Sequence, residues 1–240
     1  MATRRAIGVL GGMGPEASAN LYLKILRYSQ DHYGAVQDSD YPPVIIDSLT
    51  LEGFDETGIT NAESVERQLV DGVKKLEAAG CDLIIIACNT VHVLYDRMQQ
   101  AVSIPILNIV AETRDRVLAA GYRTVGLFAS ESTSRMHLYQ RAFEAAGIRV
   151  IEPDEEQQRV MNRVIEHVMG GNQKERDIIA LKDVARDFVG HGAEAIVLGC
   201  TEIPLAINQV HTDIKLFDTI EIIVESAVDF SLGPSDPKAK

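Results

Sequence analysis

The feature that most constrains this chain is an apolar run that ends in a cysteine and occurs twice. The first copy runs from Leu83 to Thr90 (LIIIACNT), and the second runs from Ala195 to Glu202 (AIVLGCTE). Short continuous apolar runs of this kind are typical of strands buried on both faces of a parallel sheet. Each strand then delivers a thiol, followed by small polar residues, to its carboxyl end, where α/β proteins bind their ligands.

Strand-like and helical patterns alternate along the whole chain, which predicts an α/β fold. The two halves share landmarks in the same order, namely Gly8 and Gly126, Cys88 and Cys200, and Asn108 and Asp218. This internal duplication predicts two pseudo-symmetric lobes, each a mostly parallel sheet flanked by helices, with the site in the cleft between them. We expect residues 1–112 and 213–240 to form the first lobe, and residues 113–212 the second.

Composition excludes several classes of function. With 23 Lys and Arg against 35 Asp and Glu, the net charge is −12, which disfavours nucleic-acid binding because that affinity comes largely from cationic side chains. No apolar stretch approaches the roughly 18 residues of a membrane span. The first residues lack the pattern of a signal peptide, so a cytoplasmic location is expected. Three cysteines, an odd number, argue against a disulfide framework.

The two cysteine motifs suggest a specific chemistry. Where a strand passes into a helix, unpaired backbone N–H groups favour negative charge, so they can lower a thiol pKa and bind a carboxylate. Two thiols on opposite sides of a small substrate could remove a proton from one face of a carbon and return one to the other. A lone buried cysteine is usually inert, and Cys81, at the start of a strand, is interpreted in that way.

Three motifs, 11–15 (GGMGP), 87–92 (ACNTVH) and 199–203 (GCTEI), together resemble the cofactor-independent aspartate/glutamate racemase family. The resemblance implies a two-lobed enzyme, often a homodimer, that needs neither pyridoxal phosphate nor a metal. It implies that Cys88 and Cys200 are the two acid/base catalysts acting on an amino acid. The residues expected to bind the substrate are Met13, Asn89, Thr90, Ser130, Thr133, Thr201 and Glu202.

The sequence departs from the aspartate-specific members in two places. Those members tend to have an arginine in the loop after the second strand and a lysine in the second lobe. Residues 47–57 contain no arginine, and the helix that ends near Met169 offers no matching lysine. The expected substrate is therefore aspartate, glutamate or a broader set of amino acids.

Other interpretations remain open from the sequence. Residues 12–17 (GMGPEA) match the dinucleotide-binding pattern G-x-G-x-x-A, with Asp47 at the end of a second strand. Cys88 and His92 are spaced as two metal ligands on one helical turn. His92 and Glu202 could also contact the site without binding metal. A related two-cysteine isomerase of the maleate cis–trans type, or a binding protein that has lost turnover, would keep the same two-lobed cleft.

Overall fold

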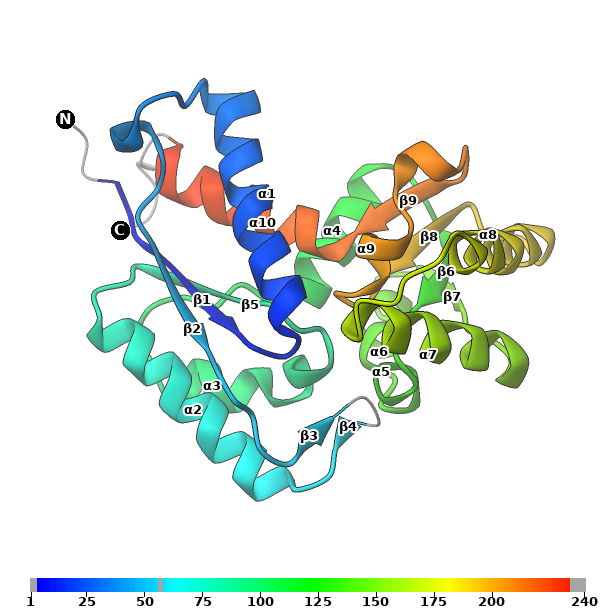
Figure 1. Ribbon diagram of the computed structural model, residues 1–240, viewed down its shortest axis with the longest axis horizontal. Coiled ribbons are helices and arrows are strands. Elements are labelled where there is room, and N and C mark those ends of the chain that lie inside the picture. The colour runs from blue at the N-terminus through cyan, green and yellow to red at the C-terminus, as the bar shows by residue number, and fades with distance from the viewer. Residues whose placement is uncertain (1–3, 56–57, 234–240) are drawn as a thin grey trace.

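Two parallel sheets organise the chain, one in each lobe (Figure 1). The computed structural model describes residues 4–55 and 58–233. The first sheet has the order β2-β1-β5, with β1 at Ile7–Gly11, β2 at Val44–Ser48 and β5 at Leu83–Ile86. The second has the order β7-β6-β8-β9, with β6 at Thr124–Phe128, β7 at Arg149–Ile151, β8 at Ala195–Leu198 and β9 at Lys215–Asp218. We call the parts built on these sheets the first and second lobes.

Helices flank both sheets, which confirms the predicted α/β fold. The α-helices are α1 (Pro15–Tyr33), α2 (Ala62–Ala78), α3 (Tyr95–Gln100), α4 (Ile109–Ala119), α5 (Glu131–Arg135), α6 (Leu138–Glu144), α7 (Glu155–Met169), α8 (Glu175–Gly190), α9 (Ile203–Ala206) and α10 (Thr219–Leu232). Short 3₁₀ helices lie at Asp38–Asp40, Thr90–Leu94 and Gln209–His211, and a small hairpin pairs β3 (Phe54–Asp55) with β4 (Gly58–Ile59). No helix in the described part of the chain is long and apolar enough to cross a membrane.

The strand register supports the predicted duplication. In the first sheet Gly8 lies opposite Ile84, and in the second sheet Gly126 lies opposite Ile196. These are the positions that the two halves share in sequence, and they lie on neighbouring strands in both sheets, β1 and β5 in the first and β6 and β8 in the second. The equivalence therefore extends from the sequence motifs to the pairing of the strands themselves.

The strands that end in cysteine are buried on both faces, as their apolar runs predict. In β5, Leu83 and Ile85 belong to a central apolar cluster that spans both lobes. Ile84 and Ile86 point the other way, into a cluster formed by the first lobe alone. Because successive side chains of a strand alternate between the faces of the sheet, an uninterrupted apolar run fills the core on both sides.

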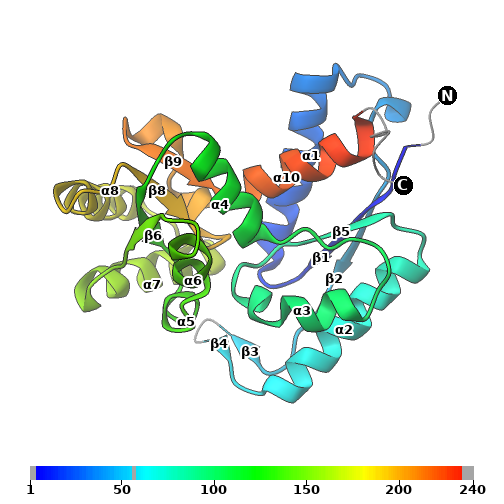
Figure 2. The same cartoon turned by 180° about the vertical axis from the view of Figure 1, so that it is seen from behind.

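The last helix of each half crosses to the opposite lobe. Asn108 caps the start of α4 by accepting hydrogen bonds from two backbone N–H groups, and Asp218 caps the start of α10 in the same way. Yet α4 packs against α6 of the second lobe, while α10 packs against α1 of the first. The two helices also pack against each other between the lobes (Figures 1 and 2). This exchange joins the two halves through a shared apolar core.

The expectation that the whole segment 213–240 returns to the first lobe is wrong for its strand. β9 pairs in parallel with β8, so it is the edge strand of the second sheet. Burial of Leu216 and Phe217 against that sheet accounts for the pairing. The helix that follows, α10, does pack on the first lobe. The exact boundaries of the lobes, at residues 112 and 212, stay a prediction.

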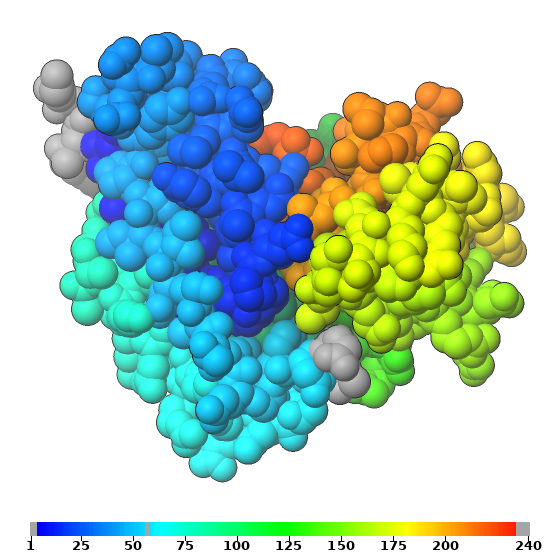
Figure 3. All heavy atoms as spheres, viewed as in Figure 1, coloured from blue at the N-terminus to red at the C-terminus, as the bar shows by residue number. Residues whose placement is uncertain are grey.

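The lobes also meet at the β3–β4 hairpin of the first lobe. This hairpin reaches toward α5 of the second lobe (Figure 1). A Cβ placed on Gly58 would lie 2.7 Å from the side chain of Ser132, so the backbone of the hairpin approaches α5 closely because residue 58 has no side chain. In the space-filling view the blue and cyan first lobe meets the yellow second lobe along a seam (Figure 3).

Candidate active site

One cavity of about 160 Å³ lies between the two lobes. Its walls come from the segments that follow β1, β2 and β5 in the first lobe, and from those that follow β6 and β8, with α7, in the second. The lining residues are Gly12, Met13, Gly14, Pro15, Leu51, Phe54, Asp55, Cys88, Asn89, Thr90, Ser130, Ser132, Ile165, Met169, Cys200, Thr201 and Glu202. The carboxyl ends of the strands therefore converge, as expected for a parallel α/β protein.

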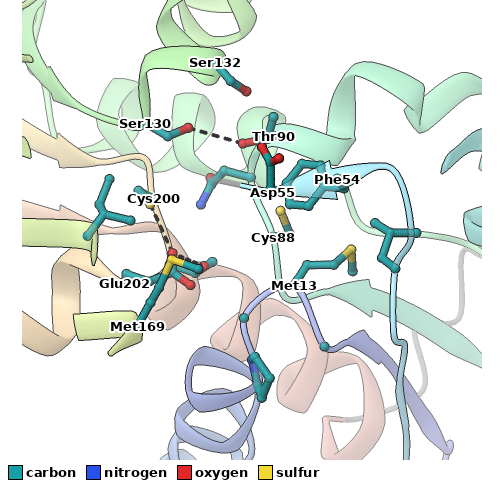
Figure 4. A pocket seen from close by; sticks show the side chains of 17 residues that line it. Met13, Phe54, Asp55, Cys88, Thr90, Ser130, Ser132, Met169, Cys200 and Glu202 are labelled. Carbon is teal, nitrogen blue, oxygen red and sulfur yellow. Dashed lines mark hydrogen bonds between the residues drawn. The ribbon is translucent and has the colours of Figure 1, made fainter. Parts of the chain in front are cut away.

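The two cysteines of the duplicated motif face this cavity from opposite lobes (Figure 4). Cys88 is 5% exposed and Cys200 is 7% exposed, and neither forms a disulfide. Each lies two residues beyond the last residue of its strand, at equivalent positions of the two lobes. Cys81, by contrast, is buried in the core of the first lobe and does not line the cavity.

Glu202 connects Cys200 to the first lobe. The Cys200 thiol donates to Oε2 of Glu202 at 3.1 Å, and the Thr201 hydroxyl donates to the same oxygen at 2.9 Å. A Cβ placed on Gly14 would lie 2.8 Å from Oε1 of Glu202. The carboxylate is thus held between a catalytic candidate of one lobe and a glycine of the other, and it lines the cavity.

A cluster of hydroxyl groups lies beside Cys88. The Thr90 hydroxyl is 2.8 Å from that of Thr133 and 3.4 Å from that of Ser130 (Figure 4 shows the second contact). Thr90 and Ser130 line the cavity, whereas Thr133 is fully buried behind them and does not. Thr133 therefore positions Thr90 instead of facing a bound molecule.

Ser132 lines the cavity although sequence reasoning did not single it out. Its hydroxyl oxygen is buried and has no hydrogen-bond partner among the residues that the structure describes. A buried hydroxyl without a partner carries a free-energy cost, which a bound ligand can remove. The hydroxyl-rich stretch 130–134 (SESTS) was the available signal, but only the start of α5 determines which of its hydroxyl groups points inward.

Asn89 lines the cavity and also links the lobes. Its side-chain oxygen accepts a hydrogen bond from the buried Tyr139 hydroxyl, and its amide nitrogen donates to the Thr219 hydroxyl at 3.3 Å. Both partners belong to the second half of the chain, whereas Asn89 follows β5. Much of its hydrogen-bonding capacity is therefore used within the protein, which fixes the backbone next to Cys88.

His92 supports the same segment from behind and does not line the cavity. Its Nδ1 lies 2.8 Å from the carbonyl oxygen of Cys88, and its Nε2 accepts from the backbone N–H of Ile109 at 3.3 Å. The ring must then carry its proton on Nδ1 and be neutral, which agrees with burial lowering the pKa of His92 to about 4. The described residues include no group of three or more His, Cys, Asp or Glu side chains that could hold a metal ion.

The environment of the cysteines favours their protonated form. Burial raises the pKa of Cys88 to about 12, although the backbone N–H groups of Val91 and Thr90 oppose that shift, and the negative charge of Glu202 adds to it. Burial and Glu202 also raise the pKa of Cys200 well above its usual value. The N–H groups at the strand ends are present as expected, but they do not outweigh burial by themselves.

Stability at alkaline pH should report this shift. An unfolded Cys88 thiol titrates near its ordinary pKa of 9.0, whereas the folded one keeps its proton up to about 12. Its contribution to the unfolding free energy is therefore fully present below pH 9 and is lost as pH rises toward 12. We expect wild type to lose more stability between about pH 8 and about pH 10 than Cys88→Ala does. Urea unfolding at both pH values measures this, and equal losses would contradict it.

Apolar side chains form a large part of the cavity wall, and most of them belong to no motif in the sequence. Leu51 and Phe54 lie in the segment after β2, and Ile165 and Met169 lie on α7. Met13, which was expected at the site, completes this set. Neither α7 nor the hairpin carries a motif, so only their packing against the other lobe reveals their role.

The dinucleotide interpretation is not favoured by the structure. Asp47, which should bind a ribose in that case, forms an ion pair with Lys75 at 2.6 Å. The loop after β1 lines the same cavity as the cysteines. A Cβ on Gly12 would lie 2.1 Å from the carbonyl oxygen of Leu49, so this glycine is required by the chain's own packing.

Comparisons with known proteins agree with the geometry. The Asp/Glu/Hydantoin racemase family profile matches residues 10–227. The broad specificity amino-acid racemase RacX of Bacillus subtilis (strain 168) is 32% identical over 95% of this chain and 98% of its own length. An aspartate racemase homologue from Pyrococcus horikoshii superposes with a TM-score of 0.81 at 30% identity, over 95% of this chain and 99% of its own.

A third comparison concerns the fold alone. The aspartate racemase of Picrophilus torridus superposes with a TM-score of 0.79 at 24% identity, over 95% of this chain and 94% of its own.

The family match and the RacX relative extend over nearly the whole chain, through both lobes and both cysteine motifs. The resemblance predicted from the three motifs is confirmed. This chain belongs to the Asp/Glu/Hydantoin racemase family and is an isomerase of the amino-acid racemase type.

Proposed function

We propose that this enzyme inverts the α-carbon of an amino acid with two cysteines, Cys88 and Cys200, and without a cofactor. The observation that carries the proposal is the placement of both thiols at equivalent strand ends, on opposite sides of one small cavity (Figure 4). A racemase needs a base on one face of the α-carbon and an acid on the other. The duplicated fold supplies one such group from each lobe.

In the proposed reaction one cysteine, as a thiolate, removes the α-proton and becomes a thiol. The bonding electrons stay on the substrate, where the α-carbon becomes planar and the charge spreads onto the carboxylate. The opposite cysteine then donates its thiol proton to the other face of the carbon and becomes a thiolate. Each turnover inverts the substrate and exchanges the protonation states of Cys88 and Cys200, so that the reverse reaction uses the same two groups.

Substrate binding can supply the charges that this step requires. The hydroxyl groups of Thr90, Ser130 and Ser132 are suited to donate to the α-carboxylate. The ammonium group brings a positive charge into a cavity whose described charged residues, Asp55 and Glu202, are both acidic. A positive charge close to a thiol lowers its pKa. Formation of the thiolate is therefore coupled to the arrival of the substrate.

Glu202 acts on the cysteines through its charge. Its carboxylate raises the pKa of both Cys88 and Cys200 and accepts the Cys200 thiol proton as a hydrogen bond. We expect Glu202→Gln to lower the pKa of Cys200, because the like charge beside the thiol is removed. The pH dependence of Cys200 alkylation by iodoacetamide, read by mass spectrometry, measures this. Glu155→Gln, an exposed carboxylate, is the control, and an unchanged alkylation midpoint in Glu202→Gln would contradict the role.

The function itself is tested by incubating each enantiomer of a panel of amino acids with the enzyme in deuterated water. Exchange of the α-proton is followed by NMR, and inversion by chiral chromatography. The proposal requires exchange and inversion together for at least one amino acid, with no pyridoxal phosphate or metal added. Absence of exchange across the whole panel would show that the proposed function is wrong.

A homodimer and a cytoplasmic location stay predictions. Three cysteines without a disulfide suit a reducing compartment, which supports the second of them. Sedimentation of the purified enzyme tests whether it is a homodimer.

A further inference from the structure

The cavity has two chemically different parts. Beside the cysteines are hydroxyl groups and the strand-end backbone, which suit the carboxylate common to all amino acids. Much of the remaining wall is apolar and is formed by Met13, Leu51, Phe54, Ile165 and Met169. We call these five residues the apolar wall. Figure 4 shows Phe54 and Met13 on the side of Cys88, and Met169 on the side of Cys200 and Glu202.

The charges of the cavity are all of one sign. None of the described residues that line it is Lys, Arg or His, and the charged ones, Asp55 and Glu202, are both acidic. The chain as a whole carries a net charge of −12. A substrate with a second carboxylate would have to lose its hydration beside two like charges and without a cation to pair with, which is unfavourable.

We propose that the apolar wall makes this enzyme selective for amino acids with neutral, apolar side chains of about the size of leucine or methionine, and that it rejects aspartate and glutamate. This inference rests on the proposed racemase function. The side chain would lie against the apolar wall and leave water, while the cysteines act on the α-carbon. Three wall residues come from the first lobe and two from the second, so the lobes jointly determine the selectivity.

The inference is tested with the same exchange measurement, using methionine, leucine, alanine, aspartate, glutamate and lysine. Filling an apolar pocket distinguishes side chains by roughly 10–200-fold for a methylene group. We therefore expect kcat/KM for methionine or leucine to exceed that for alanine by at least about tenfold, and that for either acid by about a hundredfold or more. Faster exchange of aspartate, glutamate or lysine than of methionine would overturn the inference while leaving the racemase function intact. No exchange with any amino acid would overturn both.

Two variants sharpen the result. Phe54→Ala shortens the apolar wall and should lower kcat/KM for methionine relative to that for alanine by about tenfold. Leu51→Arg places a cation in the wall and should raise kcat/KM for glutamate relative to that for methionine. Leu51→Gln, which introduces a polar but uncharged side chain, should not. Circular dichroism confirms that each variant is folded. Equal losses for methionine and alanine in Phe54→Ala would show that the residue does not contact the side chain.

Discussion

A Cys200→Ser variant is expected to lose racemisation by roughly 10²–10⁴-fold and still to exchange the α-proton of one enantiomer. The remaining thiol, Cys88, can remove the proton from the face that it contacts, exchange it with solvent and return a deuteron to that same face. Cys88→Ser should do the same with the opposite enantiomer. NMR of deuterium incorporation, combined with chiral chromatography, separates exchange from inversion. The pair of variants therefore identifies which cysteine serves which enantiomer.

Cys81→Ser is the control for these variants. Cys81 is only 4% exposed but lies in the core of the first lobe, away from the cavity. It should retain the racemisation rate of the wild type even if its stability falls. Inversion at the wild-type rate in either Cys88→Ser or Cys200→Ser would disprove the two-base mechanism.

Gly12→Ala is expected to destabilise the first lobe by more than about 3 kcal/mol. Gly12 has φ +94, and an added Cβ would lie 2.1 Å from the carbonyl oxygen and 2.6 Å from the backbone nitrogen of Leu49. Backbone atoms cannot move aside as the end of a flexible side chain can, so β1 and the segment after β2 would have to separate. The loop after β1 and the segment after β2 both line the cavity, so activity should fall with stability. Urea unfolding and the exchange assay measure the two effects.

Gly34→Ala provides the matched comparison. Gly34 also has a positive φ, +64, at the end of α1, but nothing lies within 4 Å of an added Cβ. Gly34→Ala should lower the unfolding free energy only by the conformational cost of about 1 kcal/mol, and the variant should keep full activity. Similar losses at both positions would show that the close contact with Leu49 does not matter and that only the backbone conformation does.

The parts of the fold that follow from local pattern were predictable. Apolar runs marked the strands that lead to the two cysteines, β5 and β8. Asn108 and Asp218 were matched between the halves, and in the structure each caps the start of the helix that follows it, α4 or α10. Such features depend on neighbours within a few residues, so that the sequence contains the information directly.

The contacts between elements were less predictable. The position of β9 depends on which sheet edge offers it a partner, and the exchange of α4 and α10 depends on which lobe offers an apolar groove. An apolar face on a helix shows that the helix is buried but not against which neighbour. For the same reason the short β3–β4 hairpin had no signal, although it carries Phe54 to the cavity.

The sequence by itself identified the two cysteines that we propose as the reacting groups. Cys88 and Cys200 follow from the repeated motif, because that motif places each cysteine at the carboxyl end of a parallel strand, where α/β proteins bind their ligands. The tertiary structure alone decided what surrounds them. It placed Ser132 in the cavity and Thr133 behind it, and it assembled the apolar wall from both lobes. The reason is that a thiol at a strand end is fixed by local periodicity, whereas a cavity wall exists only where distant segments pack together.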